Sequence, residues 1–262
     1  MTHATSPAAY AESLFGIEGR LAVVTGASRG IGLAVADCIA AAGADVIGVV
    51  SGRPDADTEV RAAVEGRGRK FLAVAADLAD RDEVAALAAD LATREVDILV
   101  NNAGTIRRAP AAEHTDVDFD HVLDVNLRAT FVLSREVGRA MVRRGRGKIV
   151  NTASMLSFQG GVLVPGYTSS KSAVAGLTKA LANEWAGKGV NVNAVAPGYV
   201  ATANTRDLRE DAERSRAILD RIPAGRWAEA TDIAGAVLFL CSRAADYVHG
   251  AVLPVDGGWL AR

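Results

Sequence analysis

The apolar run Leu21-Ala22-Val23-Val24-Thr25 leads directly into the glycine-rich stretch Gly26-Ala27-Ser28-Arg29-Gly30-Ile31-Gly32. A short apolar run of this kind is typical of a strand that is buried on both faces of a parallel sheet. A helical pattern follows over residues 33–42. Strand, glycine turn and helix together place backbone N–H groups at a helix N-terminus, where a pyrophosphate can bind. The stretch, with its spacing G-x-x-x-G-x-G, therefore predicts a dinucleotide-binding turn in an α/β fold.

Strands and helices alternate along the rest of the chain. We expect further strands at 44–50, 70–76, 96–100, 148–152, 190–196 and 251–255, and helices at 55–65, 80–93, 118–144, 167–186 and 231–241. Thr231 is the expected N-cap of the last helix. This alternation predicts a Rossmann-like, doubly wound parallel sheet of about seven strands with helices on both faces.

No repeat or break in composition divides residues 1–262, so we expect a single domain. The segment 199–223 carries many charged side chains between a strand and the next strong helical pattern. It is either a substrate lid or a solvated helical face, because insertions after strand ends shape the substrate site in such folds.

Composition and charge exclude several classes of function. Half of the residues are hydrophobic and the net charge is −2, with no dominant basic face, so nucleic acid is not an expected partner. The two cysteines, Cys38 and Cys241, lack the spacing of a metal site, and none is predicted. We see neither a signal peptide nor an apolar run of spanning length. We therefore expect a cytoplasmic protein with a small-molecule substrate and no membrane partner.

Tyr167 and Lys171 are four residues apart, so on a helix they share one face. A free tyrosine has a pKa of about 10 and is a poor acid–base group at neutral pH. An ammonium group beside it favours the phenolate and lowers that pKa. The pair can therefore exchange a proton with a hydroxyl group. Surface helices also carry Tyr and Lys at this spacing by chance, so the residues upstream decide the interpretation.

Those upstream residues follow predicted strands, at the sheet edge where ligands bind in this fold class. In chain order the sequence carries T-G-x-x-x-G-x-G, then N-N-A-G from Asn101, Asn126 within a helix, Ser154, and Y-x-x-x-K. This series resembles the short-chain dehydrogenase/reductase family over essentially the whole chain. The resemblance implies an NAD(P)-dependent oxidoreductase that moves a hydride between nicotinamide and a secondary alcohol or ketone.

The resemblance also implies roles for individual residues. Tyr167 would be the general acid/base, and Lys171 would lower its pKa and bind the nicotinamide ribose. Ser154 would hydrogen-bond the reacting oxygen, and Asn126 would hold a water that links Lys171 to solvent. The loop from Asn101 would pack along the cofactor, and the family typically forms homotetramers. The implied cofactor-binding residues are Gly26, Ser28, Arg29, Gly30, Ile31, Gly32, Ser51, Arg53, Asp77, Leu78, Asn102, Ala103, Gly104, Tyr167, Lys171, Pro197, Gly198, Val200 and Thr202.

Longer segments are similar to one subgroup of this family, whose members act on deoxy sugar acids of the 2-deoxy-D-gluconate or 2-dehydro-3-deoxy-D-gluconate type. They are 102–108, 153–161, 182–185, 196–199, 222–227 and 256–262. The carboxylate of such a substrate requires a guanidinium, and its hydroxyls require amide or hydroxyl partners. Segment 259–262 can close the pocket as a secondary element, and Arg226 is expected to be structural. The substrate candidates are Arg107, Arg108, Gln159 and Asn204.

Three alternatives stay open. Arg107 and Arg108 can instead form a solvated or subunit-interface pair. The end of the second strand, Val50-Ser51-Gly52-Arg53, has no carboxylate for a ribose 2′-OH, so these residues and Arg29 favour NADP whereas the subgroup favours NAD. The substrate can also be another ketone, such as a 3-oxoacyl thioester or a small carbonyl. A non-catalytic nucleotide-binding protein is disfavoured, because such a protein needs no proton relay.

Overall fold

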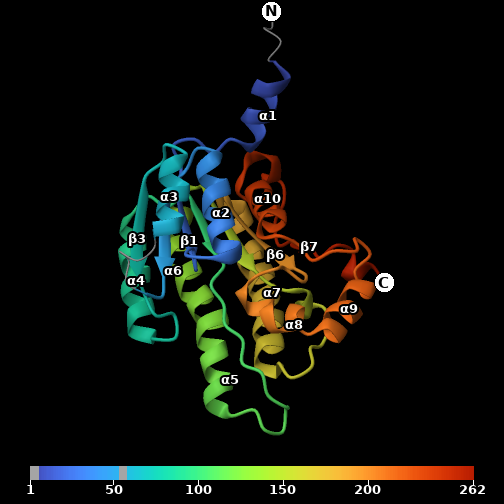
Figure 1. Ribbon diagram of the computed structural model, residues 1–262. Coiled ribbons are helices and arrows are strands. Elements are labelled where there is room, and N and C mark those ends of the chain that lie inside the picture. Colours follow the sequence, from blue (N-terminus) through green and yellow to red (C-terminus); the bar gives the residue numbers. More distant parts are fainter. Residues whose placement is uncertain (1–5, 53–57) are drawn as a thin grey trace, which may run out of the picture.

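One parallel sheet of seven strands organises the structure (Figure 1). The computed structural model describes residues 6–52 and 58–262. The strand order is β3-β2-β1-β4-β5-β6-β7, and every neighbouring pair is parallel. This arrangement confirms the predicted fold class. The strands are β1 (Leu21–Thr25), β2 (Asp45–Val50), β3 (Phe71–Ala75), β4 (Ile98–Asn101), β5 (Gly147–Thr152), β6 (Val190–Pro197) and β7 (Val252–Val255).

Helices cover both faces of the sheet because successive side chains of a strand point to opposite faces. Val24 of β1 packs in the cluster of α2 (Gly30–Ala41), α3 (Thr58–Gly66) and α10 (Ala230–Cys241). Its neighbour Val23 belongs to the other cluster. That cluster is formed with α4 (Arg81–Thr93), α6 (Ala129–Arg144) and α7 (Pro165–Trp185). Both faces of the sheet are therefore covered by packed helices.

The helix expected over 118–144 is not a continuous α-helix in the structure. It begins as α5 (Asp116–Leu123), capped by the Thr115 side chain, which accepts a hydrogen bond from Asp118 N at 3.1 Å. A π-helical turn over Asp124–Arg128 then joins α5 to α6. Such turns are rare and occur mostly at functional sites. Asn126 lies in this turn.

Other helix starts also differ. The prediction of Thr231 as an N-cap is wrong, because Glu229 is the N-cap of α10 and its N–H donates to Asp232 Oδ2 at 2.8 Å. The helix expected over 55–65 is described from Thr58, since residues 53–57 lie outside the described part. An unpredicted helix, α1 (Pro7–Phe15), projects from the body (Figure 1). Among the described residues, no helix has the length and apolarity needed to cross a bilayer.

The segment 199–223 forms two short helices, α8 (Arg206–Glu210) and α9 (Ala212–Arg221). Figure 1 shows α9 beside the last residues of the chain. Neither helix has a fully buried residue. The acidic residue Asp211 caps α9 by accepting from Glu213 N at 3.1 Å and Arg214 N at 3.0 Å. Both readings of this segment, lid and solvated face, are compatible with these helices.

Two glycines at helical positions make a matched test of this packing. A Cβ on Gly32 of α2 would lie 2.0 Å from Gly26 O, whereas a Cβ on Gly176 of α7 would meet no atom within 4 Å. We expect Gly32→Ala to lower the free energy of unfolding by at least about 2 kcal/mol, since backbone must move. Gly176→Ala should raise it by about 0.5–1 kcal/mol. Urea denaturation measures both, and equal stability of the two variants would contradict this packing.

Candidate active site

The ends of β1 and β4 are joined by side-chain hydrogen bonds. Thr25 Oγ1 accepts from Asn102 N at 3.0 Å and from Ala103 N at 2.9 Å. In return, Asn102 Nδ2 donates to Thr25 O at 3.0 Å. These bonds satisfy backbone groups that the sheet leaves unpaired where its strands diverge. The glycine turn and the 102–104 loop are therefore held side by side at the carboxyl edge of the sheet.

The glycine turn fits a dinucleotide pyrophosphate. Gly26 has φ +65°, and a Cβ there would lie 3.1 Å from Ala103 Cα. Gly30 has φ +57° and begins α2, so it needs the left-handed freedom of glycine at a helix N-terminus. A Cβ on Gly30 would lie 3.4 Å from Thr202 Cγ2. The turn is thus bordered by the 102–104 loop on one side and by Thr202 on the other, as the sequence predicted for a cofactor site.

Lys171 lies under the ring of Tyr167 on α7. Its Nζ is 5.7 Å from the ring centroid and donates to Thr152 O, at the end of β5, at 2.6 Å. Its side chain is buried, with 3 % of the residue exposed. Ser154 is also buried and follows the same strand. The structure therefore brings Ser154, Tyr167 and Lys171 together where β5 meets the first turns of α7.

Asn126 reaches the same place because of the π turn. Its Oδ1 accepts from Thr105 N at 2.8 Å, and its Nδ2 donates to Thr105 O and to Ser170 Oγ, each at 3.0 Å. Thr130 Oγ1 donates to Asn126 O at 2.9 Å. A Cβ on Gly104 would lie 3.4 Å from Asn126 Oδ1 and 3.6 Å from Lys171 Nζ. All four predicted catalytic residues are thus grouped, with Thr105 and Ser170 as partners that the motifs did not indicate.

Electrostatics at Tyr167 differ from the expectation. Burial raises the pKa of Tyr167, while the Ser154 hydroxyl and the Arg108 charge act in the opposite direction. Burial also lowers the pKa of Lys171 to about 8. Its ammonium lies 5.7 Å from the centre of the Tyr167 ring and donates to Thr152 O. Arg108 is thus a second cation whose charge favours the phenolate of Tyr167.

The four substrate candidates are divided by the structure. Arg107 pairs with Asp118 at 3.3 Å, at the start of α5. Arg108 donates to Asn204 O at 3.3 Å, which joins the 105–108 loop to the start of the lid segment. Gln159 Oε1 accepts from Arg221 Nη2 at 3.4 Å, at the end of α9. Both arginines are exposed, but Arg107 pairs with α5, whereas Arg108 connects the 105–108 loop to the segment 199–223.

Two of the residues expected along the cofactor, Asn101 and Asp77, use their side chains for hydrogen bonds within the protein. Asn101 faces the core, where its Nδ2 donates to Asn151 Oδ1 at 2.9 Å and to Ser134 Oγ at 3.0 Å, so its own side chain does not line the edge. Asp77 is exposed and accepts from Ala79 N at 2.9 Å. Arg53 lies outside the described residues. The others at strand ends or turns are Ser28, Arg29, Ile31, Ser51, Leu78, Pro197, Gly198 and Val200.

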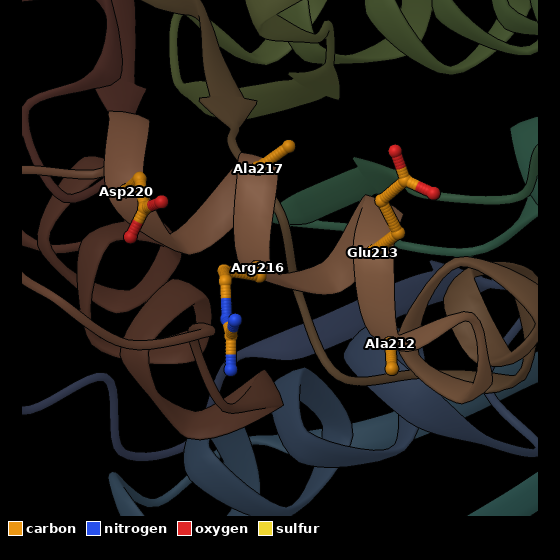
Figure 2. A pocket seen from close by; sticks show the side chains of 5 residues that line it. All are labelled: Ala212, Glu213, Arg216, Ala217 and Asp220. Atoms are coloured by element: carbon orange, nitrogen blue, oxygen red, sulfur yellow. The ribbon is translucent and has the colours of Figure 1, made fainter.

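The segment 199–223 also carries an open hollow along α9 (Figure 2). It is lined by Ala212, Glu213, Arg216, Ala217 and Asp220, and the figure shows Glu213 and Arg216 pointing away from each other. No residue of the glycine turn, the 102–108 loop or the 154–171 region lines it. We therefore assign the chemistry to the grouped residues at the sheet edge and not to this hollow.

Comparison with known proteins agrees with this geometry. The family model for short chain dehydrogenases matches residues 20–213. The chain is 55% identical over 250 residues to the 2-dehydro-3-deoxy-D-gluconate 5-dehydrogenase of Pseudoalteromonas atlantica, covering 95% of this chain and 98% of the relative. It is 51% identical over 254 residues to that of Bacillus subtilis, covering 97% and 99%.

A solved structure from Agrobacterium tumefaciens, with bound NADP, is 53% identical with a TM-score of 0.90. It covers 95% of this chain and 99% of its own, and that protein is provisionally named a 2-deoxy-D-gluconate 3-dehydrogenase.

The buried ammonium of Lys171 predicts a measurable loss of stability. Its pKa falls from 10.5 to about 8, which corresponds to about 3 kcal/mol of unfavourable burial below pH 8. Lys171→Met removes this cost but also loses the hydrogen bond to Thr152 O, which contributes about 1 kcal/mol. We therefore expect the variant to raise the free energy of unfolding at pH 7 by about 2 kcal/mol.

The sign of the pH dependence follows from proton binding. Between pH 8 and 10.5 the unfolded chain binds the Lys171 proton and the folded protein does not, so the parent protein gains stability as the pH rises. The advantage of Lys171→Met should therefore shrink over this range. Urea unfolding at pH 7 and pH 9.5 measures it, with Lys179→Met, at an exposed position of α7, as the control. An advantage that does not change with pH would show that Lys171 is not buried as an ammonium.

Proposed function

This chain belongs to the short-chain dehydrogenase family, and we propose that it interconverts a secondary alcohol and a ketone of 2-dehydro-3-deoxy-D-gluconate, with NAD(P) as the hydride carrier. The identity of 55% and 51% to relatives of that activity over nearly their full length supports this substrate. A deoxy sugar acid of the 2-deoxy-D-gluconate type fits the same chemistry. Another ketone, such as a 3-oxoacyl thioester, is the alternative, and it would not need a cation at the pocket.

The observation that carries the proposal is the position of Arg108. Burial raises the pKa of Tyr167 and the Arg108 charge acts against that rise, while the exposed Arg108 guanidinium donates to Asn204 O at 3.3 Å. A cation between the acid–base residue and the lid is where the carboxylate of a short sugar acid would bind while its distal hydroxyl meets Tyr167. Gln159 and Asn204 would then serve the remaining hydroxyls. Arg107, which pairs with Asp118, would have no direct part.

The grouped residues suit proton exchange with this hydroxyl. Tyr167 would donate or accept the proton, and the buried Ser154 hydroxyl would hydrogen-bond the same oxygen and stabilise charge as it develops. Lys171 and Asn126 would complete the relay, through the neighbouring 104–105 backbone. The bound nicotinamide supplies or accepts the hydride. The glycine turn and the 102–104 loop would hold its pyrophosphate, with Thr202 beside the turn.

We propose further that residues 1–262 form one domain with a lid at 199–223, and that the enzyme acts in the cytoplasm as a homotetramer. Free cysteines at positions 38 and 241 suit a reducing compartment. Exposed apolar side chains on the helices α5 and α6, Val117 at 79% and Phe131 at 39%, suit a subunit interface. Sedimentation velocity measures the oligomeric state directly.

Replacing each of the two neighbouring arginines by alanine tests the substrate assignment. We expect Arg108→Ala to lower kcat/KM for the sugar acid by about 10- to 150-fold, since a charge-assisted partner contributes about 1.5–3 kcal/mol. A neutral cyclic diketone should lose much less, because it has no carboxylate. Loss of the Arg108 charge should also raise the pKa of Tyr167, so the pH profiles of sugar-acid oxidation and of diketone reduction should both move to higher pH.

Arg107→Ala is the matched control and should stay close to the parent for both substrates, while Tyr167→Phe sets the background rate. Equal losses for the acid and the neutral ketone in Arg108→Ala would mean that the carboxylate is bound elsewhere. If the parent enzyme reduces ketones but does not act on the sugar acid, the result favours the alternative substrate class.

Cofactor preference is tested at the exposed residue that follows β2, Ser51. The stretch 49–53 lacks the carboxylate that would bind a ribose 2′-OH, and Arg29 is exposed at the start of α2. We expect both nucleotides to be used. Ser51→Asp should shift the ratio of kcat/KM values from NADP towards NAD by tenfold or more, because its carboxylate repels a 2′-phosphate. Ser51→Asn, which has the same shape without charge, should not do so, and an unchanged ratio in both variants would place the ribose elsewhere.

A further inference from the structure

The segment 256–262 packs on the far end of the lid helix α9. Trp259 is 4% exposed, and its ring lies between two side chains from the lid. The guanidinium carbon of Arg221 is 4.0 Å from the ring centroid, and the Tyr199 ring meets it edge-on with centroids 4.9 Å apart. Cation–π and edge-to-face contacts each contribute beyond the area that they bury. One aromatic ring thus contacts Tyr199 at the start of the lid segment and Arg221 near its end.

The backbone of this segment approaches the end of the lid closely. Gly257 and Gly258 have φ of +66° and +90°, and a Cβ on them would lie 2.9 Å from Ile222 and 3.0 Å from Pro223. Ala224 N donates to Gly257 O at 2.9 Å. The segment is itself held in shape, because Asp256 accepts from the N–H groups of residues 258 and 260, each at 2.9 Å. The glycines are therefore required by close approach as well as by conformation.

Arg262 binds the last carbonyl groups of α9. Its Nη2 donates to Asp220 O at 2.8 Å and its Nε to Arg221 O at 3.3 Å. The last carbonyls of a helix have no partner within the helix, and a cation there also complements the helix dipole. The side chain thus closes α9 of its own chain.

These contacts continue to the candidate active site. Met155, which follows Ser154 directly, packs in one buried cluster with Ile222 and Trp259. Arg221, while stacked on Trp259, also donates to Gln159 Oε1 at 3.4 Å. The segment 256–262 therefore contacts the lid and, through Met155 and Arg221, the 154–159 segment that carries Ser154 and Gln159.

We propose that the segment 256–262 is a clamp that positions the end of α9 and, through Arg221, orients Gln159 for the sugar acid. This inference rests on the proposed function for its substrate. The contacts of Arg221 and Arg262 lie at the Ile222 end of the lid, whereas Thr202, towards its other end, borders the glycine turn. Loosening the clamp should therefore weaken substrate binding and leave cofactor binding unchanged. Arg221 and Arg262 are positioning residues in this scheme.

The test compares Arg262→Ala and Arg221→Ala with Arg243→Ala, which removes an exposed arginine outside the clamp. We expect Arg262→Ala and Arg221→Ala each to raise KM for 2-dehydro-3-deoxy-D-gluconate about fivefold or more, as for the loss of an ordinary hydrogen bond. The Kd of NADPH, followed by its fluorescence, should stay within about twofold. Trp259→Phe is a milder variant, since the indole N–H has no hydrogen-bond partner among the described residues and only stacking area is lost.

Limited trypsin digestion gives a second measurement that needs no substrate. The lid carries exposed arginines at 206, 209, 214 and 216, so loosening of α9 by Arg262→Ala should accelerate cleavage there relative to the parent and to Arg243→Ala. Unchanged KM and unchanged cleavage would overturn the clamp, as would an equal rise in KM and in the Kd of NADPH. If Arg262→Ala is cleaved faster but the parent enzyme does not use the sugar acid, the clamp is supported and the proposed substrate is refuted.

Discussion

Burial of the parallel sheet on both faces is the constraint on which the rest of the structure depends. Val23 and Val24 of β1 enter opposite hydrophobic clusters, so a polar side chain on either face is buried and must find its hydrogen-bond partners within the protein. The carboxyl ends of the strands are then the place where backbone groups lack ladder partners and polar side chains can gather. Thr25 and Asn102 satisfy those backbone groups between β1 and β4. The same hydrogen bonds hold the glycine turn next to the loop that leads to Thr105 and Arg108.

Beneath this edge the protein buries polar groups that a purely stable fold would avoid. The amides of Asn101 and Asn151 bridge β4 and β5 and continue to Thr178 of α7 at 3.0 Å. Lys171, on the same helix as Thr178, is also buried, and desolvation lowers its pKa to about 8. Buried groups of this kind are tolerated when their hydrogen bonds are made, and they restrict the arrangement of the elements that carry them. These buried groups therefore lower the stability of the fold but fix the geometry around Tyr167.

The segment 199–223 has different surroundings at its two ends. Near Thr202 it borders the glycine turn, where a Cβ on Gly30 would lie 3.4 Å from Thr202 Cγ2. Near Ile222 it is held by an aromatic ring, two arginines and the close approach of two glycines. Between these ends α8 and α9 bury no residue completely. Such a segment can adjust to a substrate while its ends keep their positions.

Local patterns in the sequence determined the fold class and the family, because strand and helix periodicities, the glycine turn and the Y-x-x-x-K pair each depend on neighbouring residues. They also indicated that Asn126, Ser154, Tyr167 and Lys171 belong together. Only the tertiary structure decided the rest. The π turn at Asn126 depends on a hydrogen-bond pattern without a compositional signature, and Glu229 rather than Thr231 caps α10, where Asp232 Oδ2 accepts from Glu229 N at 2.8 Å. The choice between Arg107 and Arg108, and the contact of Arg262 with Asp220 across 42 positions, depend on packing between distant segments, which no local pattern records.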